Sequence, residues 1–345
     1  MKKATQKSLL KKPQALKKML AYKRKIQAGE YGLQLLELNY SNACNFACEH
    51  CFAKFLSNGS RRLSVADVHN LSAQADEIGV WQWHLQGGEV LTWPNLDEII
   101  AAIDPEKYYI FLTTNGYLLD QSKARHLAKI GVDKVSVSLD SFDEQQHDTI
   151  RKQPGSYRRV MNALFHASEA GLQANINTVL TRENVRSQEI LEIIEFAEKN
   201  RYTILFVIAA PVGMWEGRTD LMITEDDAVY LRDLKAKHPA IHRDLFPLFD
   251  FEWGCRTMNG LVYITENGDL LSCPFIHIRI GNVLDEPLKK ILARGWRVKY
   301  FRNFSAKCLV GEDKEFVQKI LSKTYGRKNV ISFDEAFSEE DLYPD

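Results

Sequence analysis

Short runs of branched apolar residues alternate with segments whose apolar residues recur at helical spacing, starting near residue 33. Such runs predict buried strands, and a repeat of about 3.6 residues predicts amphipathic helices. Repeated strand–helix units are typical of an α/β fold, with helices covering a parallel sheet. Six strands are predicted, at 33–38, 81–85, 108–113, 134–139, 174–180 and 204–209.

The segment between the first two strands carries the clearest helix signal. Ser64 and Asp67 have the spacing of a capping box at its start, and Gly79 ends it. Apolar residues share one face of this helix, namely Val65, Val68, Leu71, Ala75 and Ile78. Further helices are predicted at 96–103, 123–130, 157–170 and 185–199.

The regular alternation fades after Pro211, which indicates a change of domain. Farther along, Asn267 and Gly268 separate two apolar runs, 261–265 and 270–272, and this is a strong hairpin signal. A chain of 345 residues is also longer than one hydrophobic core usually serves. We therefore expect a main body followed by a smaller C-terminal domain.

The overall charge is balanced, with 45 basic and 45 acidic residues, so it predicts no particular partner. The N-terminal segment is basic by contrast, and Glu30 is its one acidic residue. Such an arm could contact RNA or an anionic lipid surface. We favour a partly helical arm that packs on the body through Leu9, Leu16 and Leu20, and we expect no nucleic-acid partner.

No secretory signal follows those basic residues, because Lys11, Lys12 and Pro13 interrupt the one nearby apolar pair. The longest apolar run, 204–212, is far too short to cross a bilayer. We therefore expect a cytoplasmic protein without a membrane span. Six cysteines in that reducing compartment indicate metal or redox chemistry rather than disulfides.

Three cysteines, Cys44, Cys48 and Cys51, lie close together directly after the first predicted strand. Parallel strand–helix folds carry their active sites on such loops. Three thiolates can bind three irons of a [4Fe–4S] cluster and leave the fourth iron open to a small molecule. The alternatives are a zinc site completed by His50, or three structural cysteines. A noncatalytic protein that binds zinc or an iron–sulfur cluster would also need only these cysteines.

The C-x3-C-x2-C spacing, with an aromatic ring before the last cysteine, resembles the signature of the radical S-adenosylmethionine (SAM) superfamily. His50 occupies the aromatic position. The resemblance implies a partial barrel of six strand–helix units of the TIM type. It implies that the three cysteines are catalytic and hold a [4Fe–4S] cluster that binds SAM and cleaves it to a 5′-deoxyadenosyl radical. An external reductant such as flavodoxin or ferredoxin is then needed.

Two further motifs support the resemblance. Gly87, Gly88 and Glu89 follow the second predicted strand and are similar to the superfamily's Gly-Gly-Glu motif, which holds the methionine amino group of the cofactor. Glycines let the chain approach a ligand closely, and Val90 stands where relatives often have proline. Asn115, in Thr-Asn-Gly at the end of the third strand, matches another common pattern.

Polar residues near the ends of later strands complete the expected cofactor site. Ser138 and Asp140 end the fourth strand, where relatives place polar groups against the cofactor. Arg151 stands where many relatives keep an arginine for the methionine carboxylate, although a plain surface arginine is the alternative. Asn177 lies on the fifth strand, and Gly213 follows the sixth, where relatives pass their backbone along the adenine.

The other three cysteines, Cys255, Cys273 and Cys308, all lie beyond the predicted barrel. The first two bracket the predicted hairpin, and this arrangement resembles the SPASM and Twitch extensions that hold auxiliary iron–sulfur clusters. The small number of cysteines fits the Twitch form with one auxiliary [4Fe–4S] cluster, for which Glu312 or Asp313 is a candidate fourth ligand. The alternative is that these cysteines are packed hairpin residues.

These observations divide the chain into five parts. They are a basic arm (1–32), a radical SAM partial barrel (33–215), a connecting helical segment (216–250), a Twitch-like α+β extension (251–325) and an acidic C-terminal tail (326–345). We expect the tail to be loosely held.

The expected enzyme removes a hydrogen atom from its substrate and then oxidises or rearranges it. Oxidation needs an electron acceptor, such as an auxiliary cluster, whereas epimerisation needs a thiol that returns hydrogen. If all six cysteines bind iron, no thiol remains, which favours oxidation. We expect a polar small molecule, such as a sugar or cyclitol, because the basic arm is shorter than a leader-binding domain. The alternative is maturation of a ribosomal precursor peptide.

Overall fold

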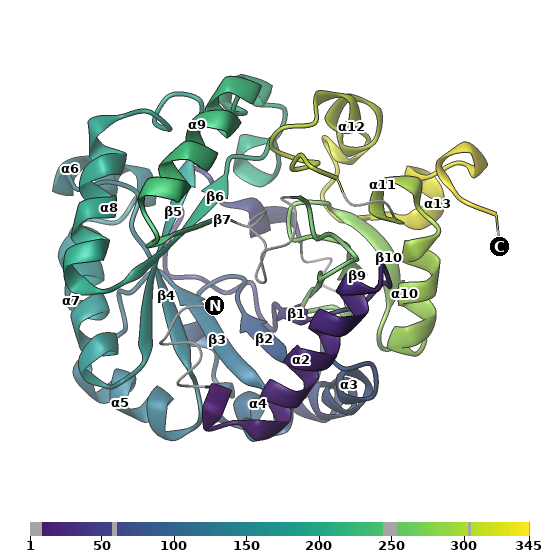
Figure 1. The fold of residues 1–345 in the computed structure, drawn as a ribbon, viewed down its shortest axis with the longest axis horizontal. Coiled ribbons are helices and arrows are strands. Elements are labelled where there is room, and N and C mark those ends of the chain that lie inside the picture. The colour runs from purple at the N-terminus through teal and green to yellow at the C-terminus, as the bar shows by residue number, and fades with distance from the viewer. Residues whose placement is uncertain (1–8, 57–60, 244–253, 303–304, 345) are drawn as a thin grey trace.

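The computed structural model describes residues 9–56, 61–243, 254–302 and 305–344. Parallel strands form a strongly curved sheet with helices on its outer side (Figure 1). These strands are β1 (Leu35–Leu38), β2 (Gln82–Leu85), β3 (Tyr109–Thr114), β4 (Lys134–Ser138), β5 (Gln173–Leu180), β6 (Thr203–Ile208) and β7 (Ile241–Arg243). Each strand pairs with the next one along the chain, as successive strand–helix units require.

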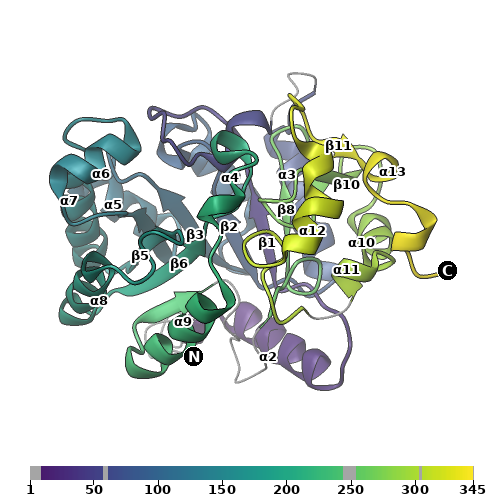
Figure 2. The ribbon, with the colours of Figure 1, turned by 90° about the horizontal axis from the view of Figure 1, so that it is seen from above.

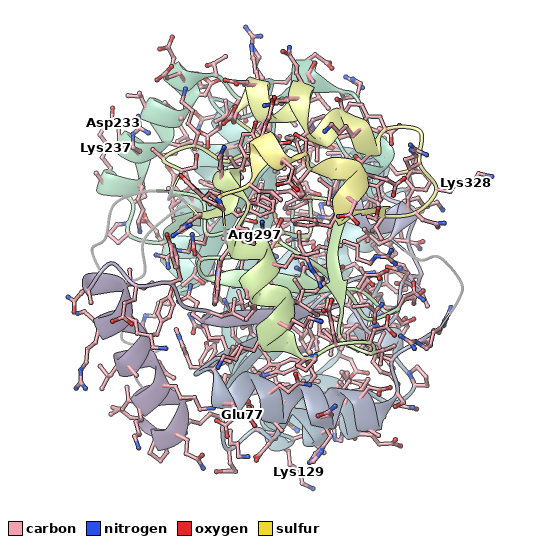
Figure 3. The ribbon with its side chains drawn as sticks, turned by 90° about the vertical axis from the view of Figure 1, so that its right-hand side faces the viewer. Glu77, Lys129, Asp233, Lys237, Arg297 and Lys328 are labelled. Carbon is pink, nitrogen blue, oxygen red and sulfur yellow. The ribbon has the colours of Figure 1, made fainter. Side chains whose placement is uncertain are left out.

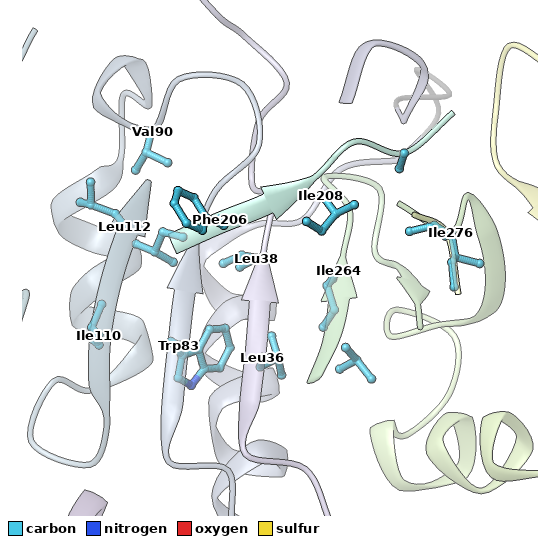
Figure 4. Close-up of a cluster of buried hydrophobic side chains, with 14 of the residues drawn as sticks. Leu36, Leu38, Trp83, Val90, Ile110, Leu112, Phe206, Ile208, Ile264 and Ile276 are labelled. Carbon is cyan, nitrogen blue, oxygen red and sulfur yellow. The ribbon is translucent and has the colours of Figure 1, made fainter. Parts of the chain in front are cut away.

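Helices between these strands cover the outer face of the sheet. They are α3 (Val65–Glu77), α4 (Leu96–Ile103), α5 (Gln121–Lys129), α6 (Glu144–Arg151), α7 (Ser156–Glu169), α8 (Gln188–Asn200) and α9 (Glu225–Lys237). Strand residues that face the helices are apolar, as Leu36, Trp83 and Ile110 are (Figure 4). Alternation points the neighbouring strand residues into the barrel, where Glu37 and His84 are buried although they are polar.

The predicted α/β fold is confirmed, including the six strands and the capping box that Ser64 and Asp67 form on α3. Two elements of this region were not predicted. Helix α6 buries His147 and Arg151 rather than apolar residues, so it lacks a helical hydrophobic pattern. Strand β7 extends the sheet beside β6 within a segment that we expected to be helical, and its three residues are too few to produce a strand pattern.

The C-terminal extension continues the same sheet. Strand β8 (Leu261–Ile264) pairs in parallel with β1, and β8 and β9 (Asp269–Leu271) form the predicted hairpin. The sheet ends with β10 (Ile278–Asn282) and β11 (Ile331–Ser332), and the helices of the extension are α10 (Leu288–Trp296), α11 (Lys299–Arg302) and α12 (Lys314–Lys319). Figure 2 shows this extension on the opposite side of the molecule from α7 and α8.

The acidic C-terminal segment packs firmly on the extension, so our expectation of a loosely held tail is wrong. It contains β11 and α13 (Phe333–Ala336), and Phe337 is buried against Phe301. Leu342 forms a β-bridge with Val298, and the Tyr343 N–H donates to the carbonyl of Arg297 at 2.7 Å. Figure 3 shows Arg297 on this face of the molecule. The acidic residues of the segment include helix caps, which explains why charge alone is misleading here.

The basic arm also packs on the body, as we favoured. Its helix α2 (Pro13–Gln27) buries Met19 and Tyr22 against a cluster that includes Trp81 and Phe111. Lys12 donates from Nζ to the carbonyls of Tyr108 (3.0 Å) and Gly131 (2.9 Å). Of the residues expected at the contact, Leu9 is fully buried and Leu16 is half-buried, whereas Leu20 is exposed.

Candidate active site

One cavity opens at the carboxyl ends of the parallel strands, and it encloses about 1050 Å³ of space including its open mouth. Parallel strands of this kind present their loops at this end, which is where barrel enzymes carry their sites. Except for Asp140 and Gly213, all the cluster and cofactor residues that we expected in the barrel line it: Cys44, Cys48, His50, Cys51, Gly87, Gly88, Glu89, Asn115, Ser138, Arg151 and Asn177.

The loop with the first three cysteines runs from β1 to a short 3-10 helix that begins at Phe52. Cys44, Cys48 and Cys51 are free cysteines, and burial raises the pKa of the Cys51 thiol. Among the described residues, no three His, Cys, Asp or Glu side chains converge closely enough to bind one metal ion. A [4Fe–4S] cluster binds each thiolate through a different iron, so three cysteines on one loop can hold three of its irons.

Gly87 and Gly88 pack directly against the cysteine loop. A Cβ atom on Gly87 would lie 2.0 Å from Asn39 Oδ1, and one on Gly88 would lie 2.1 Å from the carbonyl oxygen of Ala43. Gly87 also has φ +151°, which disfavours other residues. The N–H groups of Gly88 and Glu89 donate to carbonyls of the cysteine loop, those of Ser41 and Ala43. The glycines thus join the two predicted motifs into one surface.

Glu89 is buried, and its carboxylate ties the ends of β2 and β3 together. It accepts hydrogen bonds from Thr114 Oγ1 at 2.6 Å and from the Asn115 N–H at 2.7 Å. Burial raises the pKa of this carboxyl group even though these hydrogen bonds act in the opposite direction. Asn115 in turn donates from Nδ2 to Asn45 Oδ1 at 2.8 Å, which connects the β3 end to the cysteine loop.

Arg151 lies beside the cysteine loop rather than on the surface. Its Nη2 is 2.6 Å from Asp140 Oδ2, and its Nη1 is 3.9 Å from Cys48 Sγ. Burial alone would raise the pKa of Asp140, but the adjacent guanidinium lowers it. The Nε of Arg151 is buried without a hydrogen-bond partner among the described residues. Arg151 also lines the cavity, so its guanidinium brings a positive charge to the site.

His147 and Trp215 are among the aromatic groups at the site that were not identified from the sequence. His147 is buried behind Asp140, whose backbone N–H contacts His147 Nδ1 at 3.3 Å. Trp215 lines the cavity, and its ring centroid lies 5.5 Å from that of His50. In the sequence, the only pointer to Trp215 was the nearby Gly213. In the structure, a Cβ atom on Gly213 would lie 2.3 Å from the carbonyl oxygen of Cys51. The loop after β6 therefore closes on the cysteine loop.

Backbone contacts connect the three segments that carry the C-terminal cysteines. The Cys255 N–H donates to the carbonyl of Ser305 at 2.6 Å, close to Cys308. Thr257 donates from Oγ1 to the carbonyl of Ser272 at 2.7 Å, next to Cys273. Burial raises the pKa of the Cys273 thiol well above its usual value, and both other thiols add to this effect. The three thiols therefore lie close enough to interact electrostatically, as ligands of one cluster would.

The two carboxyl groups that we considered as a fourth ligand differ in their surroundings. Asp313 caps α12, because its Oδ1 accepts the Phe316 N–H at 3.0 Å. Glu312 instead folds back on the cysteine itself, and its Oε2 accepts the Cys308 N–H at 2.8 Å. Glu312 is thus the better-placed candidate.

An aromatic contact links the two cysteine regions. Phe52 directly follows Cys51, and Phe275 lies two residues after Cys273. Their ring centroids are 5.0 Å apart with an edge-on geometry. Both rings line the cavity, so the C-terminal extension contributes to the wall of the same site.

Sequence comparison shows which family the chain resembles over both domains. The family model of the radical SAM superfamily matches residues 38–197, and that of an iron–sulfur cluster-binding domain, SPASM, matches residues 255–311. The chain belongs to the radical SAM superfamily. This radical SAM protein is therefore an enzyme that uses a [4Fe–4S] cluster and SAM, and its SPASM domain carries auxiliary iron–sulfur chemistry.

Relatives with assigned activities fall into different groups. The chain is 22% identical over 318 residues to an AdoMet-dependent heme synthase of Nitratidesulfovibrio vulgaris, which covers 83% of this chain and 86% of the synthase. It is 29% identical over 206 residues to a GTP 3′,8-cyclase of Clostridium perfringens, which covers 57% of this chain and 62% of the cyclase.

Solved structures share the fold across both domains. Streptococcus suis SuiB bound to its precursor peptide SuiA superposes with a TM-score of 0.61 at 19% identity, covering 81% of this chain and 71% of SuiB. The structure of anSMEcpe with bound AdoMet gives a TM-score of 0.59 at 19% identity, covering 79% and 82%. At this identity the likeness concerns the fold. No helix in the described part of the chain is long and apolar enough to span a membrane.

Proposed function

We propose that this radical SAM enzyme oxidises a polar small molecule inside the cavity between its two cysteine regions. The observation that carries the proposal is the shared wall of this cavity, where Phe275 of the extension meets Phe52 of the cysteine loop. An oxidation needs a route for electrons away from the substrate, and the auxiliary site adjoins the cavity.

We assign the first cluster to Cys44, Cys48 and Cys51, and the auxiliary cluster to the three C-terminal cysteines. When bound, the first cluster and SAM supply the hydrogen-abstracting chemistry of the superfamily. Burial of Cys51 and Cys273 keeps these thiols protonated without metal, and coordination to iron removes such protons.

We assign the binding of SAM to groups that surround the cysteine loop. The Arg151 guanidinium lies beside the cysteine loop in a residue that lines the cavity, and its charge is suited to a carboxylate. The tight packing of Gly87 and Gly88 brings backbone to the cavity wall without side chains in the way. Other polar groups that line the cavity are Glu89, Asn115, Ser138 and Asn177. Asp140 is not at the wall, and we assign it the role of orienting Arg151.

Oxidation is favoured over epimerisation because all six cysteines are assigned to iron–sulfur clusters, which leaves no thiol to return a hydrogen atom. The chain has six, and they fall into one group of three at each site. An epimerase needs a thiol beside the substrate that is not bound to iron. We therefore infer that the substrate radical formed in the first step loses one electron instead of regaining a hydrogen atom, with flavodoxin or ferredoxin as the external reductant for SAM cleavage.

A peptide substrate is the second candidate. It is favoured by the structural likeness to SuiB, which was solved with its precursor peptide SuiA, and to anSMEcpe, which was solved with a peptide. A short precursor gene beside the gene for this chain would support it.

The test is an anaerobic assay of the reconstituted chain with SAM and dithionite. The proposal predicts formation of 5′-deoxyadenosine in the wild-type chain and none with Cys48→Ala. A panel of sugars, cyclitols and amino sugars is then compared with peptides for stimulated cleavage and for loss of two hydrogens from the added compound. Stimulation by peptides alone would replace the first candidate with the second.

A further inference from the structure

A buried polar layer crosses the barrel beneath the cavity. Glu37 on β1, His84 on β2 and Thr113 on β3 point into the barrel at neighbouring register positions. Glu37 Oε1 lies 2.8 Å from His84 Nδ1, and His84 Nε2 lies 2.8 Å from Thr113 Oγ1. Glu37 and His84 are buried, whereas Thr113 lines the cavity. A carboxylate, an imidazole and a hydroxyl are thus connected in a row that ends at the site.

The hydrogen bonds next to this row set the direction of its protons. Asn175 Nδ2 contacts the carbonyl of Ile176, which can only accept, so this atom is the amide nitrogen. The same nitrogen donates to Asn177 Oδ1 at 2.8 Å. Asn177 therefore presents Nδ2 to Thr113 Oγ1, at 3.3 Å, and Thr113 accepts there. The hydroxyl hydrogen of Thr113 can then be donated to His84 Nε2, in the tautomer whose Nδ1–H donates to Glu37.

We propose that Glu37, His84 and Thr113 form a proton relay that accepts a proton from a hydroxyl or ammonium group of the substrate. The substrate proton passes to Thr113 Oγ1 as the hydroxyl hydrogen moves to His84 Nε2. The resulting imidazolium faces the Glu37 carboxylate through Nδ1–H. The substrate loses one proton and the relay gains one, and return to the starting state releases that proton to solvent. Thr113 is the group that touches substrate, and His84 and Glu37 act through it.

The surroundings keep His84 ready to accept. Burial lowers the pKa of His84, Glu37 opposes this and Lys134 on β4 adds to it, so the ring is neutral at neutral pH. Phe111 stacks on the imidazole with centroids 4.3 Å apart, which fixes the ring. Tyr263 on β8 is opposite Glu37, and burial raises its pKa well above the usual value, so it brings no charge.

The relay narrows the class of substrate to compounds that can give up a proton. This step rests on the proposed function, the oxidation of a polar small molecule. Oxidation of a carbon that bears a hydroxyl or amino group removes one hydrogen from carbon and one proton from oxygen or nitrogen. A thioether or an unsubstituted alkyl chain has no such proton to give. The relay therefore fits an alcohol or amine whose reacting carbon lies above Thr113.

The test is the protonation state of His84 in the oxidised, reconstituted full-length chain, followed by NMR with ¹⁵N-labelled histidine. Comparison with His84→Gln assigns the signal. The relay predicts a neutral ring with hydrogen on Nδ1, and Thr113→Val should raise its pKa by about half a unit because a donor to the neutral form is lost. Glu37→Gln should lower it, and Thr113→Ser should restore the wild-type value.

Tyr109→Phe is the matched control, because it removes a hydroxyl from the same strand outside the relay, where Tyr109 donates to Gln173. It should leave the His84 pKa unchanged. Hydrogen on Nε2, or an unchanged pKa in Thr113→Val, would overturn the relay. If Glu37→Gln does not fold, the His84 pKa values in Thr113→Val and Thr113→Ser are sufficient to test the relay. Because the readout needs no substrate and no SAM cleavage, it is independent of whether the proposed oxidation holds.

Discussion

The two cysteine sites are built in opposite ways. Cys44, Cys48 and Cys51 belong to one loop, whereas Cys255, Cys273 and Cys308 come from segments that meet only when β8, β9 and the following helices fold. A loop can present its thiols with little help, but the second site depends on tertiary packing. Substitutions should therefore affect chemistry at the first site and also stability at the second.

The largest expected effect is that of Cys48→Ala. Loss of one thiolate from the loop should abolish 5′-deoxyadenosine formation and lower the iron content from about eight to about four per chain. The fold should persist, because Cys48 is only half-buried. Anaerobic product analysis and iron assay measure both. Continued product formation would refute the assignment of this loop.

Cys273→Ala should give the complementary result. The iron content should again fall to about four, while cleavage of SAM without substrate continues and substrate oxidation is lost. Unlike Cys48→Ala, it should also lower the melting temperature of the reconstituted chain, because the auxiliary metal joins distant segments. An iron content that stays near eight would exclude Cys273 from the ligands.

Gly88→Ala tests how closely the Gly-Gly-Glu motif packs on the cysteine loop. The added Cβ would lie 2.1 Å from the carbonyl of Ala43, so either the loop or the motif must move. We expect a loss of about 1–3 kcal/mol in stability and weaker SAM binding, measured by denaturant unfolding and calorimetry. Gly32 is the matched control, since its Cβ would meet only ends of flexible side chains, the nearest that of Tyr22 at 3.2 Å. Equal effects of Gly32→Ala on SAM binding would contradict the account.

One buried histidine in each region should make the stability of the chain depend on pH. Burial lowers the pKa of His147 in the barrel and of His277 in the extension to about 4. The unfolded chain takes up these protons first, so stability is full above about pH 6.5 and falls as the pH decreases toward 4. His277→Gln should flatten this fall by about 1–3 kcal/mol, seen in denaturant unfolding between pH 7 and 5. An unchanged slope would show that His277 does not titrate as described.

The smallest expected effects show which carboxylate, that of Glu312 or that of Asp313, binds the auxiliary cluster. Asp313→Ala removes the cap of α12 and should lower stability by about 1 kcal/mol without changing iron content. Glu312→Gln should leave stability nearly unchanged and alter the spectrum of the auxiliary cluster. The reverse pattern would make Asp313 the ligand.

The sequence was sufficient for the parts of the molecule that local patterns specify. Strand runs, the capping box of α3 and the Asn267–Gly268 hairpin depend on residues close in sequence, and the structure contains them. Elements without an apolar pattern, such as α6, were not predicted. The packing of the acidic tail was not predicted either, because its carboxylates take part in helix caps.

Contacts between distant strands could not be foreseen. Glu37 and His84 are separated by 47 residues, and neither belongs to a motif that would connect them. The joining of β8 to β1 and the contact of Phe52 with Phe275 likewise arise from tertiary folding. Local spacing thus predicted where SAM binds, and tertiary structure was needed to relate that place to the second group of cysteines and to the barrel interior.

The most direct measurement is the electron paramagnetic resonance spectrum of the dithionite-reduced Cys273→Ala chain, which retains only the cluster of the cysteine loop, with and without SAM. The account predicts a [4Fe–4S] signal whose shape changes when SAM is added, because SAM binds the iron that lacks a protein ligand. A signal that SAM leaves unchanged, or zinc in place of iron at Cys44, Cys48 and Cys51, would contradict it.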